Sequence, residues 1–140
     1  MLEFAGINLW AVALVWLIYI AIGSFWYSPA GLGRQWTKLT KIDLLKMPKK
    51  ESTQAIVSVA ISAIFQVLAL AVVINSLHIT GSAPATQGFM VGFVLWLGLT
   101  AATTVGVTLY QRRGWKFLWL NSGYFFVVMS IGSVILAVWQ

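Results

Sequence analysis

Four long apolar segments are the feature that most constrains how this chain folds. Each exceeds the roughly 20 helical residues that cross the hydrocarbon layer of a bilayer, and none contains Asp, Glu, Lys or Arg. Lipid cannot satisfy open backbone groups, and the short alternating segments that are typical of barrel strands are not seen, so the segments are expected to be helices. The sequence predicts an all-α, polytopic membrane protein, one domain with four transmembrane helices in a bundle, at about 6–27, 54–77, 87–110 and 117–139.

The composition agrees with lipid as the main solvent. Apolar residues make up 60% of the 140 residues and charged residues only 9%, whereas about a quarter of a soluble domain is charged. Cysteine is absent, which excludes disulfides, thiolate metal sites and cysteine nucleophiles. The net charge is +6. In a membrane protein, basic residues mark the segments that face the cytoplasm and contact anionic lipid, so we expect no nucleic-acid partner.

The nine Lys and Arg residues lie in only two connecting segments, after the first and the third apolar segment. Loops rich in Lys and Arg stay cytoplasmic, so we expect a multi-pass protein of the cytoplasmic (inner) membrane with both termini outside. Such a strong bias also predicts that any homo-oligomer is parallel. The residues expected at anionic headgroups are Arg34, Lys38, Lys41, Arg112, Arg113 and Lys116.

The first apolar segment ends in an order of residues that follows depth in a membrane. Trp26 and Tyr27 are aromatic residues of the kind that concentrate at the interface, and Pro29 follows where the helix is expected to end. Basic residues come next along the chain. We therefore expect the motif from Trp26 through Tyr27 and Ser28 to Pro29 to anchor the chain at the cytoplasmic interface.

A short amphipathic pattern follows this motif. Leu32, Trp36 and Leu39 recur at helical spacing, while the intervening basic residues lie on other faces. The pattern predicts a short interfacial helix in the first cytoplasmic loop, with Trp36 as its membrane anchor. A structured loop in water is the alternative, and the two interpretations have about equal weight.

Several of these residues also carry a resemblance to a known family. They are WYSP at 26–29 with Gly33 and Trp36, WLGL at 96–99, and Asn121, Gly123 and Tyr124. With them the sequence resembles the small bacterial membrane proteins grouped as domain of unknown function 1761, from Ile7 through Trp139. The resemblance implies a four-helix membrane protein with no assigned activity, so it transfers no catalytic residue. The basic stretch KMPKKE departs from the commoner family pattern.

Titratable side chains are scarce where chemistry inside a membrane would need them. Glu3, Asp43, Glu51 and the single histidine, His78, all lie outside the apolar segments. A buried metal site or a proton relay cannot be assembled from them within one chain, and no GxSxG or GxxxxGK motif is present. We therefore expect a non-enzymatic protein with no catalytic residue, no metal and no cofactor.

Mildly polar and aromatic side chains within the apolar segments are the remaining candidates for a site. Ser58, Ser62 and Gln66 share one helix face, where hydrogen bonds between helices are favoured over a solute pathway. Packing is likewise favoured for the aromatic residues. The candidates for solute binding or a solute pathway are Trp16, Tyr19, Gln66, Trp96, Asn121 and Tyr124.

A small-residue pattern predicts close helix packing in the third segment. Gly88 and Gly92 form a GxxxG motif, and Gly98 and Gly106 continue the composition along the helix. The partner helix, in the same chain or in a second copy, stays open.

Two functional hypotheses follow from the sequence. The first is an integral membrane protein with a non-enzymatic binding or assembly role at the cytoplasmic membrane. The alternative is an oligomeric transporter of a small solute or a hydrophobic cation. Water access to Gln66 from either side would favour the transporter.

Overall fold

The computed structural model describes residues 2–79 and 82–139, and within these residues it contains helices and no strand. The helices in chain order are α1 (Leu9–Trp26), α2 (Gly33–Thr40), the 3₁₀ turn η1 (Leu44–Lys46), α3 (Lys49–Ser76), α4 (Pro84–Leu95), the π-helical segment η2 (Trp96–Ala101), α5 (Ala102–Tyr110) and α6 (Gly114–Val138). Four stretches are long and apolar enough to cross a membrane, namely α1, α3, the continuous α4–η2–α5 and α6. The prediction of an all-helical chain with four helices long and apolar enough to span a membrane is confirmed.

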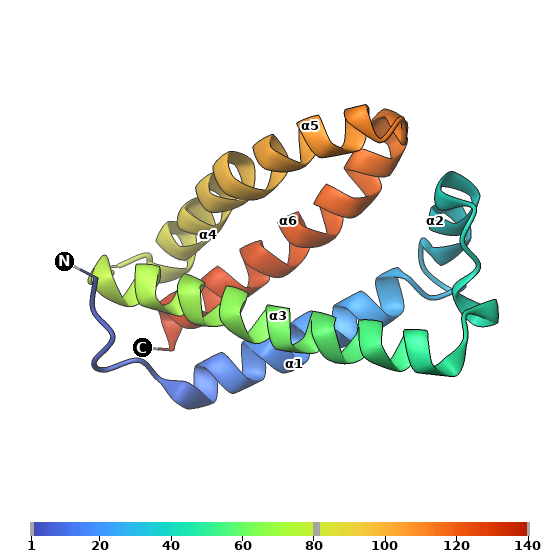
Figure 1. Cartoon of the computed structure of the whole chain (residues 1–140). Helices are drawn as coiled ribbons and strands as arrows, with labels where there is room; N and C mark the ends of the chain where they lie inside the picture. The colour runs from blue at the N-terminus through green and yellow to red at the C-terminus, as the bar shows by residue number, and fades with distance from the viewer. Residues whose placement is uncertain (1, 80–81, 140) are drawn as a thin grey trace.

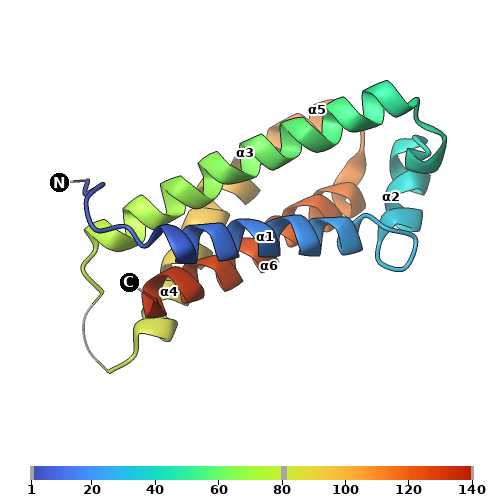
Figure 2. The same ribbon diagram turned by 90° about the horizontal axis from the view of Figure 1, so that it is seen from below.

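The four long stretches run back and forth, so that the chain has two distinct ends (Figure 1). Both termini lie at one end with the α3–α4 connection, which we call the termini end. Helix α2 and the α5–α6 connection lie at the opposite end, as the rotated view also shows (Figure 2). All nine basic residues lie in α2, in the segment from α2 through the first turn of α3, or around the α5–α6 connection. We therefore call this the basic end.

Helix α6 is the central element, because it packs against α1, α3, α4 and α5. The side chains that are most completely buried come from α1, α3 and α6, among them Val15, Val67 and Val128. Much of the remaining apolar surface is exposed, including Ile56 and Phe65 of α3. An apolar exterior of this kind is what contact with lipid requires.

Glycines bring α4 close to α6. An added Cβ atom at Gly88 would lie 2.6 Å from the Ser133 carbonyl oxygen, and one at Gly92 would lie 2.8 Å from the Met129 carbonyl oxygen. The GxxxG prediction is therefore confirmed, with a partner helix in the same chain. Gly98 and Gly106 do not continue this packing within the chain, because a Cβ atom at either position would meet nothing within 4 Å.

The helix ends differ from the edges of the apolar segments for local reasons. The Asn8 side chain accepts hydrogen bonds from the Trp10 and Ala11 backbone N–H groups, so α1 begins at Leu9 rather than at residue 6. Helix α3 begins at Lys49, ahead of the expected residue 54, because Lys, Glu and Gln are good helix formers outside the apolar layer. Pro84, at the first position of α4, likewise starts the third span before residue 87.

A tight turn connects α1 to α2, and the WYSP motif forms it. The Leu32 N–H donates to the Trp26 carbonyl over 2.7 Å, and the Ser28 hydroxyl donates to the Phe25 carbonyl over 2.7 Å. A Cβ atom at Gly33 would lie 2.6 Å from the Ser28 carbonyl oxygen, so only glycine fits there without a shift of the backbone. The short helix expected around Trp36 follows directly as α2.

Candidate functional site

The candidate residues from the sequence fall into separate places in the structure. Trp26, Tyr27, Asn121 and Tyr124 meet at the basic end, in what we call the α1–α6 clasp. Tyr19 and Gln66 lie farther along the bundle and line one pocket, which we call the central pocket.

The α1–α6 clasp is held by hydrogen bonds between the two helices. The Tyr27 hydroxyl donates to Asn121 Oδ1 over 2.9 Å, and the Trp26 indole N–H donates to the Leu120 carbonyl over 3.2 Å. The Tyr27 and Tyr124 rings pack with centroids 5.7 Å apart. Motif residues that are about ninety positions apart in the chain therefore form one contact between the first and last spans.

Neighbouring groups complete the clasp. The Tyr124 hydroxyl donates to the Tyr19 carbonyl over 3.1 Å, and the Trp36 ring of α2 packs edge-on against Tyr27 with centroids 6.3 Å apart. Tyr27 follows the last residue of α1, and burial raises the pKa of its phenol, which keeps the hydroxyl protonated as a donor. Because these hydroxyl and indole donors already have partners, the clasp fixes the positions of α1 and α6 relative to each other.

The central pocket lies between α1, α3, α6 and the π-helical segment η2, and its volume is about 230 Å³. The residues that line it are Tyr19, Gln66, Ala69, Leu70, Val73, Leu95, Leu99, Thr100 and Met129. Most are apolar, and three polar side chains stand among them. A largely apolar cavity with a few polar groups is the usual form of a small-molecule site.

The polar groups of the central pocket are short of partners. Tyr19 is only 1% exposed, and its hydroxyl has no hydrogen-bond partner among the described residues. A buried polar group left in this way costs about 1–3 kcal/mol. The Thr100 hydroxyl donates to the Met129 sulfur over 3.6 Å, and a thioether sulfur is a weak acceptor. Tyr19 thus lines the pocket and carries a buried hydroxyl that the described residues leave without a partner.

The central pocket opens toward the side of the bundle. Gln66 and Ala69 of α3 and Leu99 of η2 line it and are also exposed on the outer surface of the bundle. This surface belongs to stretches that are apolar enough to span a membrane. The pocket therefore opens on the apolar flank of the bundle.

At the termini end, the N-terminal segment closes the bundle. The Asn75 side-chain amide donates to the Glu3 carbonyl over 3.2 Å and to the Ala5 carbonyl over 2.9 Å, and the Glu3 N–H donates to the Ser76 hydroxyl over 2.7 Å. His78 pairs with the Glu3 carboxylate at 3.1 Å. These contacts hold the segment before α1 against the end of α3.

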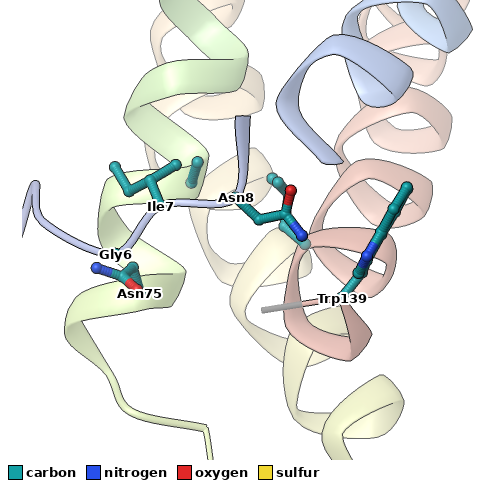
Figure 3. Close-up of a pocket in the computed structure, with 7 residues that line it drawn as sticks. Gly6, Ile7, Asn8, Asn75 and Trp139 are labelled. Atoms are coloured by element: carbon teal, nitrogen blue, oxygen red, sulfur yellow. The ribbon is translucent and has the colours of Figure 1, made fainter. Parts of the chain in front are cut away.

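A small pocket lies beneath this segment (Figure 3). Gly6, Ile7 and Asn8 line it from the N-terminal side, and Asn75 and Trp139 line it from α3 and the chain end. Its volume is about 10 Å³, close to the space that one water molecule needs. This pocket is too small for a solute larger than water.

Other candidate residues from the sequence act in packing. The Trp16 indole N–H donates to the Ala60 carbonyl over 2.9 Å, and the Trp96 indole N–H donates to the Ser122 carbonyl over 2.8 Å. Neither residue lines the central pocket. Of the expected bonds between helices, the one from Ser62 is not formed within the chain, because its hydroxyl donates within α3 to the Ser58 carbonyl over 2.8 Å.

Sequence reasoning missed two parts of the site. Met129 was not selected as a pocket residue, and η2 was expected to be ordinary α-helix. The WLGL stretch at 96–99, part of the family resemblance, coincides with η2, but nothing in its composition indicates a π-helical segment. Among the described residues there is no group of three or more His, Cys, Asp and Glu side chains that could hold a metal ion.

Comparison with known proteins agrees with the resemblance seen in the sequence. The family model described as "Protein of unknown function (DUF1761)" matches residues 10–137, which is nearly the whole chain. No curated protein and no solved structure matches the chain. The matched region includes the α1–α6 clasp, the central pocket and α2. The protein therefore belongs to the DUF1761 family.

Proposed function

We propose that this protein is a non-enzymatic membrane protein that binds an amphipathic small molecule inside the bilayer, in the central pocket. The observation that carries the proposal is the buried Tyr19 hydroxyl, which has no partner among the described residues. A bound molecule with a polar group would offset the free energy that this hydroxyl costs the protein.

The lining of the pocket indicates the chemical class of that molecule. Tyr19 and Thr100 each provide a hydroxyl, and Gln66 provides an amide, so the site can both donate and accept hydrogen bonds. No charged side chain lines the pocket, and an ionised group is costly in lipid without a partner. The ligand we propose is therefore mostly apolar, with one neutral polar group, and it enters from the lipid.

Transport is the second candidate, and one observation favours it. The π-helical segment η2 forms a wall of the pocket, and π-helical turns often occur at functional sites. In this alternative, an oligomer moves a small solute or a hydrophobic cation past Gln66. Binding is preferred because the N-terminal segment and the α1–α6 clasp hold the two ends of the bundle together.

The proposal places the protein in the cytoplasmic membrane with both termini outside. Its support is the separation of the basic residues at one end from both termini at the other (Figure 1). In this orientation α2 lies in the cytoplasmic interface, and the basic residues contact anionic headgroups. Self-association is parallel, since every copy inserts with the same charge bias.

Mass spectrometry of molecules that copurify with the protein in mild detergent tests the binding proposal. The wild-type protein should retain a small molecule with a polar group, and Tyr19→Phe combined with Gln66→Leu should lose it. Gln87→Leu is the matched control, because Gln87 is exposed and does not line the central pocket. Equal retention by the pocket variant and the control would contradict the proposal.

A further inference from the structure

We propose that a second pocket, between α2 and α6 at the basic end, holds one anionic phospholipid whose phosphate is bound by Lys38 and Lys116. The inference rests on the proposed contact of the basic end with anionic headgroups, and it goes further by naming a single site. We call it the basic-end pocket. It is separate from the central pocket and shares no lining residue with it.

The size and position of the basic-end pocket suit a lipid headgroup. Its volume is about 780 Å³, within the range of small-molecule sites. Lys38 comes from α2, whereas Lys116 comes from the first turn of α6, so the pocket exists only because α2 packs beside α6. It lies where α1 ends and α6 begins, which is the boundary between apolar spans and the basic segments.

The charge in the pocket has one sign. Lys38 and Lys116 both line it, and neither takes part in an ion pair with a described residue. No acidic side chain is among the residues that line the pocket, and Asp43, which follows α2, pairs with Lys46 at 3.6 Å. Two lysines and an adjacent amide, that of Gln35, provide donors for phosphate oxygens.

The walls of the pocket distinguish a phospholipid from free phosphate. Trp26, Leu39 and Trp119 line it, and the Trp26 indole N–H is already engaged with the Leu120 carbonyl, so the Trp26 ring acts as an apolar wall. Inorganic phosphate has nothing to place against these side chains. A phospholipid places its phosphate at the lysines and its glycerol and first acyl carbons along the rings, as aromatic residues at interfaces allow.

Native mass spectrometry of the purified chain, titrated with phosphatidylglycerol in detergent, tests the site. The pocket variant combines Lys38→Gln with Lys116→Gln. The matched control combines Lys49→Gln with Lys50→Gln, which removes the same charge from the same end at exposed residues outside the pocket. We expect the dissociation constant of the first bound lipid to rise on the order of ten- to thirtyfold in the pocket variant and less than about threefold in the control.

Further measurements distinguish a bound phospholipid from inorganic phosphate, and a single lipid site from general contact with headgroups. Phosphatidylcholine with the same acyl chains should bind more weakly than phosphatidylglycerol, and inorganic phosphate should not displace the bound lipid. Displacement by inorganic phosphate would overturn the lipid assignment. Equal weakening in both variants would overturn the site and leave general headgroup contact standing, whereas no weakening in either would overturn both.

Discussion

The Tyr19 hydroxyl is the residue-scale feature on which the proposed function depends. Tyr124→Phe removes a hydroxyl that donates to the Tyr19 carbonyl over 3.1 Å, while Tyr19→Phe removes one without a partner among the described residues. We expect Tyr124→Phe to lower the free energy of unfolding by about 0.6–1.7 kcal/mol. We expect Tyr19→Phe to raise it by about 1 kcal/mol in protein freed of bound molecules.

The measurement is unfolding of the two variants in detergent after exhaustive removal of bound small molecules. Both substitutions delete one oxygen from a buried tyrosine, so each is the control for the other. A loss of stability in Tyr19→Phe as large as that in Tyr124→Phe would mean that the Tyr19 hydroxyl has a structural role, and the ligand proposal would lose its main support.

Two glycines of the third span differ in how closely they pack, and alanine substitutions should show this difference in stability. Gly92→Ala should destabilise the protein by about 1–3 kcal/mol, because the new methyl group meets the Met129 carbonyl oxygen of α6 at 2.8 Å. Gly98→Ala, with nothing within 4 Å of the added atom, should be neutral or stabilising by up to about 1 kcal/mol. Thermal unfolding midpoints measured side by side would contradict this account if the two variants shifted equally.

At the scale of elements, periodicity and charge predicted most of what the structure contains. All four spans and the short helix at Trp36 follow from apolar length and helical spacing. The π-helical segment η2 could not be predicted, because its residues have no composition that differs from the α-helix around it. The central pocket depends on how η2 and α3 pack against α1, which is a tertiary property.

The candidate site was only partly predictable for the same reason. Gln66 stood out as a polar residue within an apolar segment, and Tyr19 belonged to an aromatic stripe, so both could be selected from the sequence. Asn121 was selected as a polar residue within an apolar segment and Tyr124 through the family resemblance, yet their side chains bond to Tyr27 and to the Tyr19 carbonyl. Sequence patterns place a side chain on a face but do not reveal its partner.

The position of α2 at the membrane interface can be tested separately. If Leu32, Trp36 and Leu39 face the bundle and the interface, a spin label at residue 36 should be shielded from an aqueous quencher in anionic bilayers. Shielding should persist in part at high salt, because apolar contact is not screened as charge is. A label at the exposed Lys49 is the control, and equal quenching at residues 36 and 49 would show that α2 lies in water.

For the whole molecule, the division of charge between the two ends predicts a single orientation. In this chain without cysteine, Ser82→Cys at the termini end should react with an impermeant thiol reagent from outside, and Thr40→Cys at the basic end only from inside. Labelling of Thr40→Cys from outside in intact cells would overturn the orientation. Cross-linking of residue 82 in one copy to residue 40 in another would contradict a parallel oligomer.

The central claim is that the pocket at Gln66 is entered from lipid and not from water. A spin label placed at residue 66 in bilayers measures this directly through its collisions with oxygen, which concentrates in the hydrocarbon layer, and with a water-soluble nickel chelate. Our account predicts frequent collisions with oxygen and few with the chelate added to either side, in contrast to a label at Thr40. Access of the chelate to residue 66 as high as at residue 40 would contradict it and would favour a transport pathway.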